Sequence, residues 1–382
     1  MEQMEEALFM ERIKVGVIFG GRSAEHEVSI ASAKALIDSL DRRKYEPVPM
    51  GIDLNGWWHI DADPARMIES GGKVKALPGR PLKETLPTPS GRSLADRFAC
   101  TGNGHSRVDV IFPLIHGTYG EDGTLQGLLE MAGLPYVGAG VLGSAVGMDK
   151  WCQKLVLSAA DIPVVDFVAF RHADYVGHEE EIEKRILEKL HFPLFVKPSN
   201  SGSSKGISKV KTAEELRLAI VDALSYDRRI VVEQGLSARE LETAVLGNDT
   251  PKASRVGEVL PLREWYDFEA KYSEGGMRLA VPADIDSSLE ARIQELAIRA
   301  FTVTDTFGMA RIDFFLDRET GRLCLNEINT IPGFTAMSVY SKLWAASGIP
   351  YGKLVDRLIE LALERHQTKE PVFLREISHG NH

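Results

Sequence analysis

Residues 308–329 hold the densest group of residue types that could perform chemistry: Gly-Met-Ala-Arg-Ile-Asp-Phe-Phe-Leu-Asp-Arg-Glu-Thr-Gly-Arg-Leu-Cys-Leu-Asn-Glu-Ile-Asn. Two runs in which apolar and polar residues alternate flank a polar turn that contains Gly321. This pattern predicts an antiparallel hairpin whose turn is centred near residue 320.

That hairpin would gather oxygen atoms on one face. It sets Asp313 opposite Glu327 and Arg311 opposite Asn329, and directly opposed side chains lie about 5 Å apart at Cβ. Mg²⁺ prefers oxygen ligands and takes one or two carboxylates together with substrate phosphates. The sequence therefore predicts a metal site made of Asp313, Glu327 and Asn329. The alternative is a solvated face that carries an Arg–Asp cross-strand pair.

The alternation also assigns the two faces of the hairpin, because successive side chains of a strand point to opposite sides. Phe315 and Leu325 are expected beside the polar residues. The residues expected on the core face are Ile312, Phe314, Leu316, Cys324 and Ile328.

A second group of small and basic residues spans 197–206, Lys-Pro-Ser-Asn-Ser-Gly-Ser-Ser-Lys-Gly. Small residues let backbone N–H groups approach phosphate oxygens, and the hydroxyls add donors. The segment is not a Walker A loop, because no Gly-Lys-Ser/Thr opens a helix. The basic residue Lys197 instead ends the preceding strand. A phosphate loop and an ordinary flexible hairpin turn both remain open at this point.

The N-terminal elements predict an α/β domain. A continuous apolar strand over 13–19 is typical of a parallel sheet buried on both faces. A helix over 24–40 with Ser23 as its N-cap and a strand over 45–52 complete a β-α-β start. The strand does not lead into a G-x-G-x-x-G sequence, so a nicotinamide-dependent dehydrogenase is a poor fit.

Two early motifs carry further candidates. Glu25 and Glu27 fall in the first turn of that helix, where the positive end of the helix dipole stabilises carboxylates, so structure alone could explain them. His116 lies in the glycine-rich segment 116–123, where it could be a turn residue or a functional one.

The rest of the chain divides into three expected domains: 1–138 with a loop-rich insertion at 61–107, 139–235, and 236–382. Further helices are expected at 124–132, 150–160, 179–190, 213–224 and 351–365. Further strands are expected at 108–113, 164–170, 193–197, 207–211, 229–233 and 240–246.

Composition excludes several classes of protein. Of the 382 residues, 44% are hydrophobic and 26% charged, and the net charge of −10 argues against a nucleic-acid surface. Three widely spaced cysteines without a C-x-x-C pair argue against structural zinc and for a reducing compartment. The first six residues are acidic where a signal peptide would be basic, which favours the cytoplasm. Met10 is an alternative start.

From about Arg12 to His366, the chain resembles the ATP-grasp superfamily and, within it, the D-alanine–D-alanine ligase family. The motifs that carry the resemblance are 20–29 (Gly-Gly-Arg-Ser-Ala-Glu-His-Glu-Val-Ser), 116–123 (His-Gly-Thr-Tyr-Gly-Glu-Asp-Gly), 148–150 (Met-Asp-Lys), 197–206, 266–272 (Tyr-Asp-Phe-Glu-Ala-Lys-Tyr), the hairpin and 329–335 (Asn-Thr-Ile-Pro-Gly-Phe-Thr). Their order and spacing together are specific, although each alone is modest.

The resemblance implies a three-domain ATP-grasp fold, α/β with an α+β C-terminal part, that holds ATP between the central and C-terminal domains. Its implied nucleotide contacts are Lys150 and Lys197 on the phosphates, Ser204 in the loop 201–206 above them, Glu233, Gln234 and Leu236 at the adenine, and Glu240 at the ribose. Two Mg²⁺ ions, for which Mn²⁺ could substitute, would be held by Asp313, Glu327 and Asn329.

The resemblance also implies roles around the two amino acids. Glu25, supported by Ser203 and Tyr272 and with His116 beside it, would hold the ammonium group of the first D-alanine. The implied contacts of the reacting groups are Arg311 and the Gly333 amide at the oxyanion, Ser338 at the carboxylate of the second D-alanine, and Lys271 at the γ-phosphate.

The implied reaction joins two D-alanines with hydrolysis of ATP to ADP and phosphate, through a D-alanyl phosphate, for peptidoglycan synthesis. The resemblance also implies a homodimeric, cytoplasmic enzyme. Ligases that form D-alanyl-D-lactate or D-alanyl-D-serine are the near alternatives, and Tyr272 favours the dipeptide because depsipeptide-forming relatives typically replace it. A non-catalytic nucleotide-binding homologue is the remote alternative. Lys205, where the family usually has an apolar residue, and Tyr119 are small departures.

Overall fold

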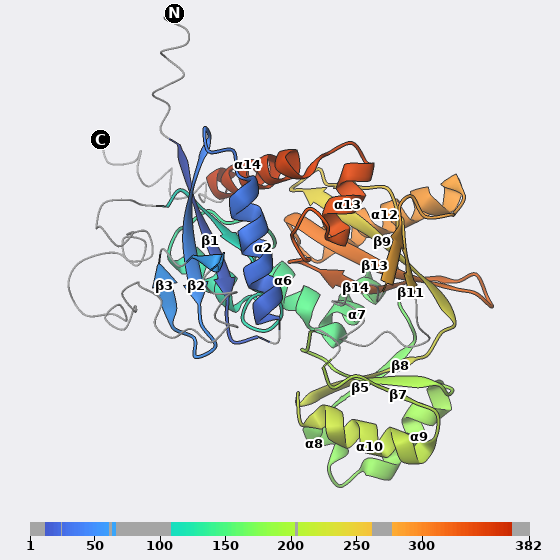
Figure 1. Cartoon of the computed structure of the whole chain (residues 1–382). Coiled ribbons are helices and arrows are strands. Elements are labelled where there is room, and N and C mark those ends of the chain that lie inside the picture. The colour runs from blue at the N-terminus through green and yellow to red at the C-terminus, as the bar shows by residue number, and fades with distance from the viewer. Residues whose placement is uncertain are drawn as a thin grey trace, which may run out of the picture.

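The computed structural model describes residues 12–23, 25–60, 63–65, 108–202, 205–261 and 277–368. Within them the strands form three sheets, which follow one another along the chain. Figure 1 shows the N-terminal sheet beside the C-terminal one, with the central sheet forming a separate lobe below. Most of the insertion 61–107, and the alternative start at Met10, lie outside the described residues.

The N-terminal sheet has the order β3-β2-β1-β4, with β1 parallel to both β2 and β4. The expected β-α-β start is confirmed, because β2 spans the predicted residues and β1 and α2 differ from prediction by two residues or fewer at each end. The elements are β1 (Ile13–Gly20), α2 (His26–Ser39), β2 (Tyr45–Ile52), β3 (Trp58–Ile60), β4 (Val110–Pro113) and α5 (Thr124–Met131).

The N-cap prediction for α2 is wrong. Glu25, not Ser23, occupies the N-cap position, and its side chain makes no capping bond. The Ser23 hydroxyl instead accepts a hydrogen bond from the Glu25 N–H at 3.0 Å, two residues on. This short turn places the Glu25 carboxylate at the start of the helix.

The central lobe is a four-stranded sheet of order β5-β8-β6-β7 with helices on its outer side (Figure 1). Its elements, with the two helices that lead into it, are α6 (Val141–Met148), α7 (Lys150–Ala159), β5 (Phe167–Arg171), α8 (His172–Tyr175), α9 (Glu179–Lys189), β6 (Leu194–Pro198), β7 (Ser208–Val210), α10 (Ala213–Leu224) and β8 (Arg229–Gln234). Residues of α9, α10 and the inner strands, Ile186, Ile220 and Val232 among them, share one core.

The C-terminal sheet has the order β12-β11-β9-β13-β14, with β10 paired to β9. Its elements are β9 (Ala238–Gly247), β10 (Lys252–Ala253), β11 (Gly257–Pro261), β12 (Met277–Ala280), α12 (Ser287–Val303), β13 (Gly308–Asp317), β14 (Leu323–Asn329), α13 (Val339–Ala346) and α14 (Tyr351–Thr368). Leu354 and Leu358 of α14 share a core with Val15 and Phe19 of β1, so the last helix fastens this unit to the N-terminal sheet.

The predicted hairpin is present as β13 and β14. Arg311 pairs with Asn329 and Asp313 with Glu327, as the sequence predicted. After Asp313 the register shifts, so that Phe314 pairs with Leu325. A bulge of this kind places an extra residue in one strand and reverses the faces beyond it.

The bulge makes two face assignments wrong. Leu325 belongs to the apolar core with Phe314, whereas Cys324 pairs with Phe315. Cys324 therefore shares the face of Asp313 and not the core face of Ile312 and Phe314. Burial raises the pKa of the Cys324 thiol.

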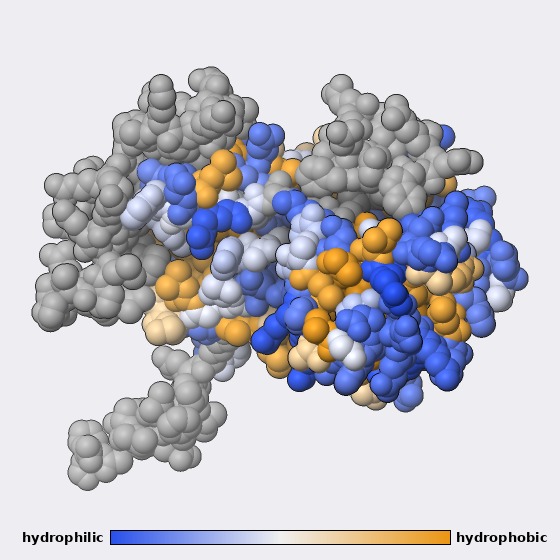
Figure 2. Space-filling model, turned by 90° about the horizontal axis from the view of Figure 1, so that it is seen from below, coloured by the Kyte–Doolittle hydropathy of each residue, from blue (hydrophilic) through white to orange (hydrophobic). Residues whose placement is uncertain are grey.

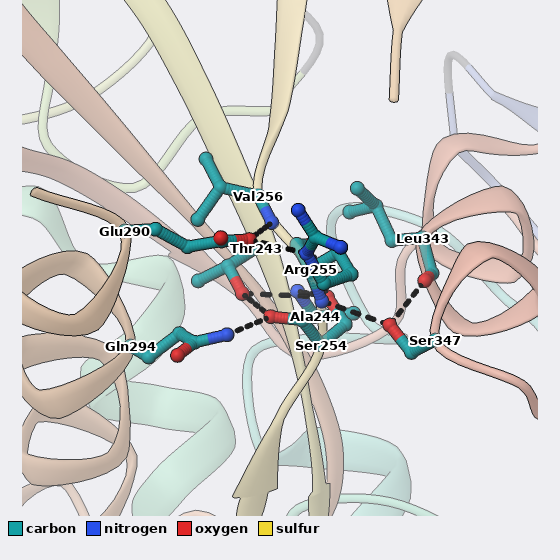
Figure 3. A network of polar contacts seen from close by, with 9 residues as sticks. All are labelled: Thr243, Ala244, Ser254, Arg255, Val256, Glu290, Gln294, Leu343 and Ser347. Carbon is teal, nitrogen blue, oxygen red and sulfur yellow. Dashed lines mark hydrogen bonds and ion pairs between the residues drawn. The ribbon is translucent and has the colours of Figure 1, made fainter. Parts of the chain in front are cut away.

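Ser254, between β10 and β11, joins β9 to two helices (Figure 3). Its hydroxyl accepts a hydrogen bond from the Ala244 N–H at 2.9 Å, and its carbonyl accepts one from Gln294 of α12 at 2.8 Å. The next residue, Arg255, donates its backbone N–H to the Ser347 hydroxyl at 2.8 Å. Its side chain pairs with Glu290 at 2.7 Å. Strand β9 is thus tied to α12 and the end of α13.

Replacing Ser254 by alanine is expected to lower the free energy of unfolding by about 1–3 kcal/mol, because the buried Ala244 N–H loses its acceptor. Urea unfolding followed by circular dichroism measures the change. Ser158→Ala, at an exposed position of α7, is the matched control and should change stability little. Equal stabilities of the two variants would contradict the assignment.

In Figure 2 the outer face of the central lobe is turned toward the viewer and mixes hydrophilic residues with small hydrophobic patches. Exposed apolar residues there include Val176, after α8, and Leu218 and Val221 of α10. In the part of the chain that the structure describes, no helix is both long and apolar enough to cross a membrane.

Candidate active site

One face of the hairpin collects the charged residues that the sequence predicted. Arg311 donates two hydrogen bonds to Asp313, from Nε to Oδ1 and from Nη2 to Oδ2, both at 2.7 Å. Arg311 Nε also lies 3.2 Å from Oε2 of Glu242 on the neighbouring strand β9. Burial alone would lower the pKa of Arg311, but these two carboxylates outweigh it and raise the pKa well above its ordinary value. The Arg–Asp pair is thus real, although it lies within one strand and not across two.

The rest of this face suits a divalent cation. Asp313 pairs with Glu327 across the two strands, and Asn329 lies two residues further along β14 on the same side. Among the described residues, the side-chain oxygen of Asn329 is buried and accepts no hydrogen bond. A buried amide oxygen without a donor is unfavourable unless a ligand uses it. A magnesium ion bound by two carboxylates and this oxygen would satisfy it, with phosphate oxygens filling the remaining positions.

A second charged cluster lies inside the central lobe. Glu233 of β8 is 3.0 Å from Lys154 Nζ through Oε1 and 2.6 Å from Lys197 Nζ through Oε2. Burial alone would raise the pKa of Glu233, but the two lysines outweigh it and lower the pKa to about 2. Glu233 and Lys197 were predicted site residues. Lys154 was not, and it is almost fully buried.

Lys150 holds the start of the glycine-serine loop. Its Nζ donates to the Ser201 carbonyl at 2.6 Å, and its backbone N–H donates to the Ser199 carbonyl at 2.9 Å. The preceding residue, Asp149, accepts from the Ser199 hydroxyl at 2.8 Å and pairs with Arg229 at 2.6 Å. Helix α7 therefore begins against the loop that follows Lys197, and the sequence-distant Lys150 and Lys197 flank one segment.

Glu25 lies where the N-terminal unit meets this loop. A Cβ atom added to Gly117 would be 3.1 Å from Oε2 of Glu25, and one added to Gly202 would be 3.7 Å from the same atom. Larger residues at these two positions would thus crowd the carboxylate. The structure brings together Glu25, the segment that begins at His116 and the glycine-serine loop.

His116 is buried behind Glu25. Its Nδ1 donates to the carbonyl of Ile331 at 2.9 Å, which leaves Nε2 as an acceptor 3.4 Å from the Ser32 hydroxyl. Burial lowers the pKa of His116, against the opposing charge of Glu25. A neutral imidazole therefore joins the N-terminal segment to the chain that follows β14.

Glu121 makes the same connection and was missed by the sequence analysis. One of its carboxylate oxygens accepts from the Gly117 N–H at 2.7 Å and the other from the Ile331 N–H at 3.0 Å. Burial raises the pKa of Glu121 to about 8, and the nearby charge of Glu25 adds to the effect. Its motif was recognised, but sequence spacing gave no sign that this residue would reach a loop 210 positions away.

The raised pKa of Glu121 predicts that the free energy of unfolding depends on pH. Since the folded protein binds the Glu121 proton more tightly than the unfolded chain does, this group lowers stability progressively as pH rises from about 4.5 to about 8. We therefore expect wild-type protein to lose stability relative to Glu121→Gln between pH 5 and pH 8.5, as measured by urea unfolding. An exposed control, Glu188→Gln, should give a difference that changes little with pH. A pH-independent difference for Glu121→Gln would contradict the assignment.

The loop after β14 holds two more predicted residues. A Cβ atom added to Gly333 would lie 3.4 Å from the Ser338 hydroxyl, so these two positions are adjacent. Ser338 precedes α13, and its hydroxyl accepts from the Thr335 N–H at 3.0 Å. The Gly333 backbone and the Ser338 hydroxyl thus lie on one turn, close behind the last metal candidate in the chain.

The remaining nucleotide candidates are only partly placed. Glu240 and Glu242 alternate along β9 opposite Phe315 and Asp313, so both lie on the site face of the sheet. The Gln234 side chain is bonded to the backbone of His191, which leaves only its backbone to contact a base. Leu236 is partly buried just after β8. Four predicted residues lie outside the described residues: Ser203, Ser204, Lys271 and Tyr272.

The central unit contacts β14 of the C-terminal sheet. The Leu325 N–H of β14 donates to the Pro163 carbonyl at 2.7 Å, which anchors the central lobe to the C-terminal sheet. Lys154 of α7 lies close enough to Cys324 of β14 for each to influence the pKa of the other. The lysine–glutamate cluster therefore lies near β14, the second strand of the hairpin. An open depression lined by α9 and α10 residues such as Glu180 and Arg217 belongs to the outer side of the central lobe.

Most of the chain matches models of one known protein family. Residues 14–139 match the family described as the D-ala D-ala ligase N-terminus, and residues 156–360 match the D-ala D-ala ligase C-terminus. The chain is 45% identical to the D-alanine–D-alanine ligase of Ruminiclostridium cellulolyticum, over 94% of this chain and 97% of that protein. It is 46% identical to the ligase of a Thermoanaerobacter species, over 94% and 99%.

Solved structures agree with the sequence comparison. The D-alanine–D-alanine ligase from Coxiella burnetii superposes with a TM-score of 0.79 at 36% identity, covering 98% of this chain and all of that one. The VanG D-Ala:D-Ser ligase from Enterococcus faecalis gives 0.78 at 34% identity, over 92% and 100%. The chain therefore belongs to the D-alanine–D-alanine ligase family and has its ATP-grasp fold.

Proposed function

We propose that this ATP-dependent enzyme joins two D-alanines to D-alanyl-D-alanine through a D-alanyl phosphate, releasing ADP and phosphate, for peptidoglycan precursor synthesis in the cytoplasm. The observation that carries the proposal is the pairing of Arg311, Asp313, Glu327 and Asn329 on one hairpin face. We infer that this face and the Lys197–Glu233 cluster border one space, which would bring carboxylates for a metal close to cations for phosphates.

In the first step, a carboxylate oxygen of the first D-alanine attacks the γ-phosphorus of ATP. A new O–P bond forms, the bond from the γ-phosphorus to its bridging oxygen breaks, and ADP leaves. Glu25 would hold the ammonium group of this substrate beside Gly117 and Gly202. Lys150 and Lys197 would contact phosphate oxygens, where cations stabilise the charge of the moving group.

In the second step, the free amine of the second D-alanine attacks the carbonyl carbon of the acyl phosphate. Negative charge then develops on the carbonyl oxygen, and the C–O bond to phosphate breaks as the amine loses its proton. Arg311 and the Gly333 N–H would donate to that oxygen. Ser338, on the same turn as Gly333, would hold the second carboxylate.

Asp313, Glu327 and Asn329 would hold Mg²⁺, or Mn²⁺ in its place, and we propose two ions. When bound, such ions neutralise phosphate charge during transfer. We further propose that Ser203, Ser204, Lys271 and Tyr272 complete the site: Ser203 and Tyr272 beside Glu25, and Ser204 and Lys271 at the phosphates. Glu233, Gln234 and Leu236 would line the adenine site and Glu240 the ribose site. A homodimer is the proposed assembly.

Phosphate release from ATP tests the proposal. Purified protein is given D-alanine, L-alanine, D-lactate and D-serine, separately and in pairs, and the products are identified by mass spectrometry. We expect the D-alanine dipeptide as the main product. The similarity to a D-Ala:D-Ser ligase makes D-serine the critical competitor. Preferential use of D-serine or D-lactate as second substrate would overturn the choice of product, and release of no phosphate under any condition would overturn the reaction.

A further inference from the structure

Lys154 is a buried lysine that has no role in the proposed reaction. Its side chain is 1% exposed, Glu233 is 4% exposed and Lys197 is 11% exposed. Burying an ammonium group is costly even when it is paired. Since Lys197 alone could neutralise Glu233, the second lysine calls for an explanation.

The contacts divide the Glu233 carboxylate between two sides. Oε1 is 3.0 Å from Lys154 and Oε2 is 2.6 Å from Lys197. Lys154 lies on the sealed side, where its ammonium group is also 5.7 Å from the ring centre of Phe167. Lys197 is the more exposed of the two lysines, so a ligand that binds this cluster would meet Lys197 and the edge of Glu233 before Lys154.

The accessible pair has a donor and an acceptor side by side. The Lys197 ammonium group has three N–H donors, so it could bind Glu233, a phosphate oxygen and the base together. Adenine presents a matching edge, with an amino donor at N6 and an acceptor at N7, whereas guanine presents acceptors at both O6 and N7. A carboxylate beside Lys197 would accept from the adenine amino group and repel the guanine oxygen. This discrimination requires that an oxygen of Glu233 stay available to the base.

We propose that Lys154 is a positioning residue for base selection: it holds Glu233 from behind, so that the Lys197–Glu233 edge accepts a 6-aminopurine and rejects a 6-oxopurine. Without Lys154, both oxygens of Glu233 would turn to the one remaining lysine. The acceptor for the amino group would then be lost, and Lys197 would be drawn away from the base. The inference rests on the proposed function, which places adenine at Glu233.

A double-mutant cycle in nucleotide binding tests this role, because residues that act through one another give non-additive effects. The variants are Lys154→Met, Glu233→Gln and the pair together. Calorimetry measures the Kd of ADP, GDP and inorganic tripolyphosphate, the last as a probe without a base. Lys189→Met is the matched control, since Lys189 also lies 5.7 Å from the Phe167 ring centre but is exposed and bonds the Phe167 carbonyl.

We expect Lys154→Met to weaken ADP binding about tenfold or more and to reduce the preference for ADP over GDP, while tripolyphosphate binding changes less. The double variant should show the same ADP-to-GDP ratio as Glu233→Gln alone. Additive effects on that ratio, or an equal loss for all three ligands, would overturn the proposal in favour of a direct charge effect. An unchanged ratio with only a lower Tm would overturn it in favour of a structural role.

Two further results keep the test decisive. If Lys154→Met does not fold, the double variant, which removes a buried pair, is compared with Glu233→Gln. An equal ratio of the Kd values of ADP and GDP in these two variants supports the proposal, and a different ratio contradicts it. The readout is binding and not dipeptide synthesis. A protein that selects ADP through Lys154 but makes no dipeptide would therefore refute the proposed function and leave this inference intact.

Discussion

Replacing Glu327 by glutamine is expected to lower kcat by about 10³-fold, with little change in the free energy of unfolding. Glu327 pairs with Asp313 across the hairpin, beside the buried amide oxygen of Asn329. The amide keeps the shape of the side chain but removes a negative charge from the proposed metal ligands. A single preorganised electrostatic partner of a reacting group is commonly worth about 10²–10³ in kcat, and here the loss also lowers occupancy by the metal.

The measurement is ATP-dependent phosphate release as a function of Mg²⁺ concentration, with unfolding in urea as the stability readout. Glu319→Gln is the matched control, because Glu319 is exposed in the turn of the same hairpin. It should behave as wild type in both assays. If Glu327→Gln kept wild-type kcat and wild-type dependence on Mg²⁺, the metal assignment would be wrong.

The hairpin illustrates how far sequence reasoning reaches. The pairings of Asp313 with Glu327 and of Arg311 with Asn329 could be read from alternation and from a local turn, and both are confirmed. The bulge beyond Asp313 could not, because it depends on which of Cys324 and Leu325 packs better against α12 and its neighbours. Strict alternation therefore failed one residue past the site.

Helix α12 was missed for a different reason. Its N-cap Asp286 accepts from two backbone N–H groups, and Ile293, Leu296, Ala297 and Ala300 form a buried stripe. Those signals were present in the sequence, but no helix was predicted between the strand at 240–246 and the hairpin. The missed signal was the helical spacing of the apolar residues, which indicates a helix even between segments predicted as strands.

Lys154 and Glu121 show what spacing alone cannot supply. Lys154 is one of several polar residues in α7, and only the packing of α7 against β8 singles it out by burying it beside Glu233. Glu121 acquires its role from a contact with Ile331. Both depend on the docking of units that are distant in sequence. Motif order could locate the site, but the second layer of charged residues behind it required the fold.

Arg311→Lys is expected to lower kcat by about 10²–10³-fold even though it preserves the positive charge. Arg311 binds Asp313 through two parallel hydrogen bonds and also reaches Glu242. A lysine ammonium group is a point donor and cannot reproduce this planar fork. It would be drawn to one of the carboxylates, so the donor aimed at the developing oxyanion would be displaced. Stability should also fall, by about 1–3 kcal/mol, as one buried carboxylate loses its partner.

The matched control is Arg239→Lys. Arg239 makes a similar two-bond contact with Glu258, at 2.8 and 2.6 Å, but it lies on the opposite face of β9 from Glu240 and Glu242. The same chemical change there should cost stability and leave kcat nearly unchanged. Steady-state kinetics together with urea unfolding separates the two effects. If Arg311→Lys lost stability alone, as Arg239→Lys is expected to, then Arg311 would only brace Asp313, and the oxyanion would have to be stabilised by the Gly333 amide and the metal.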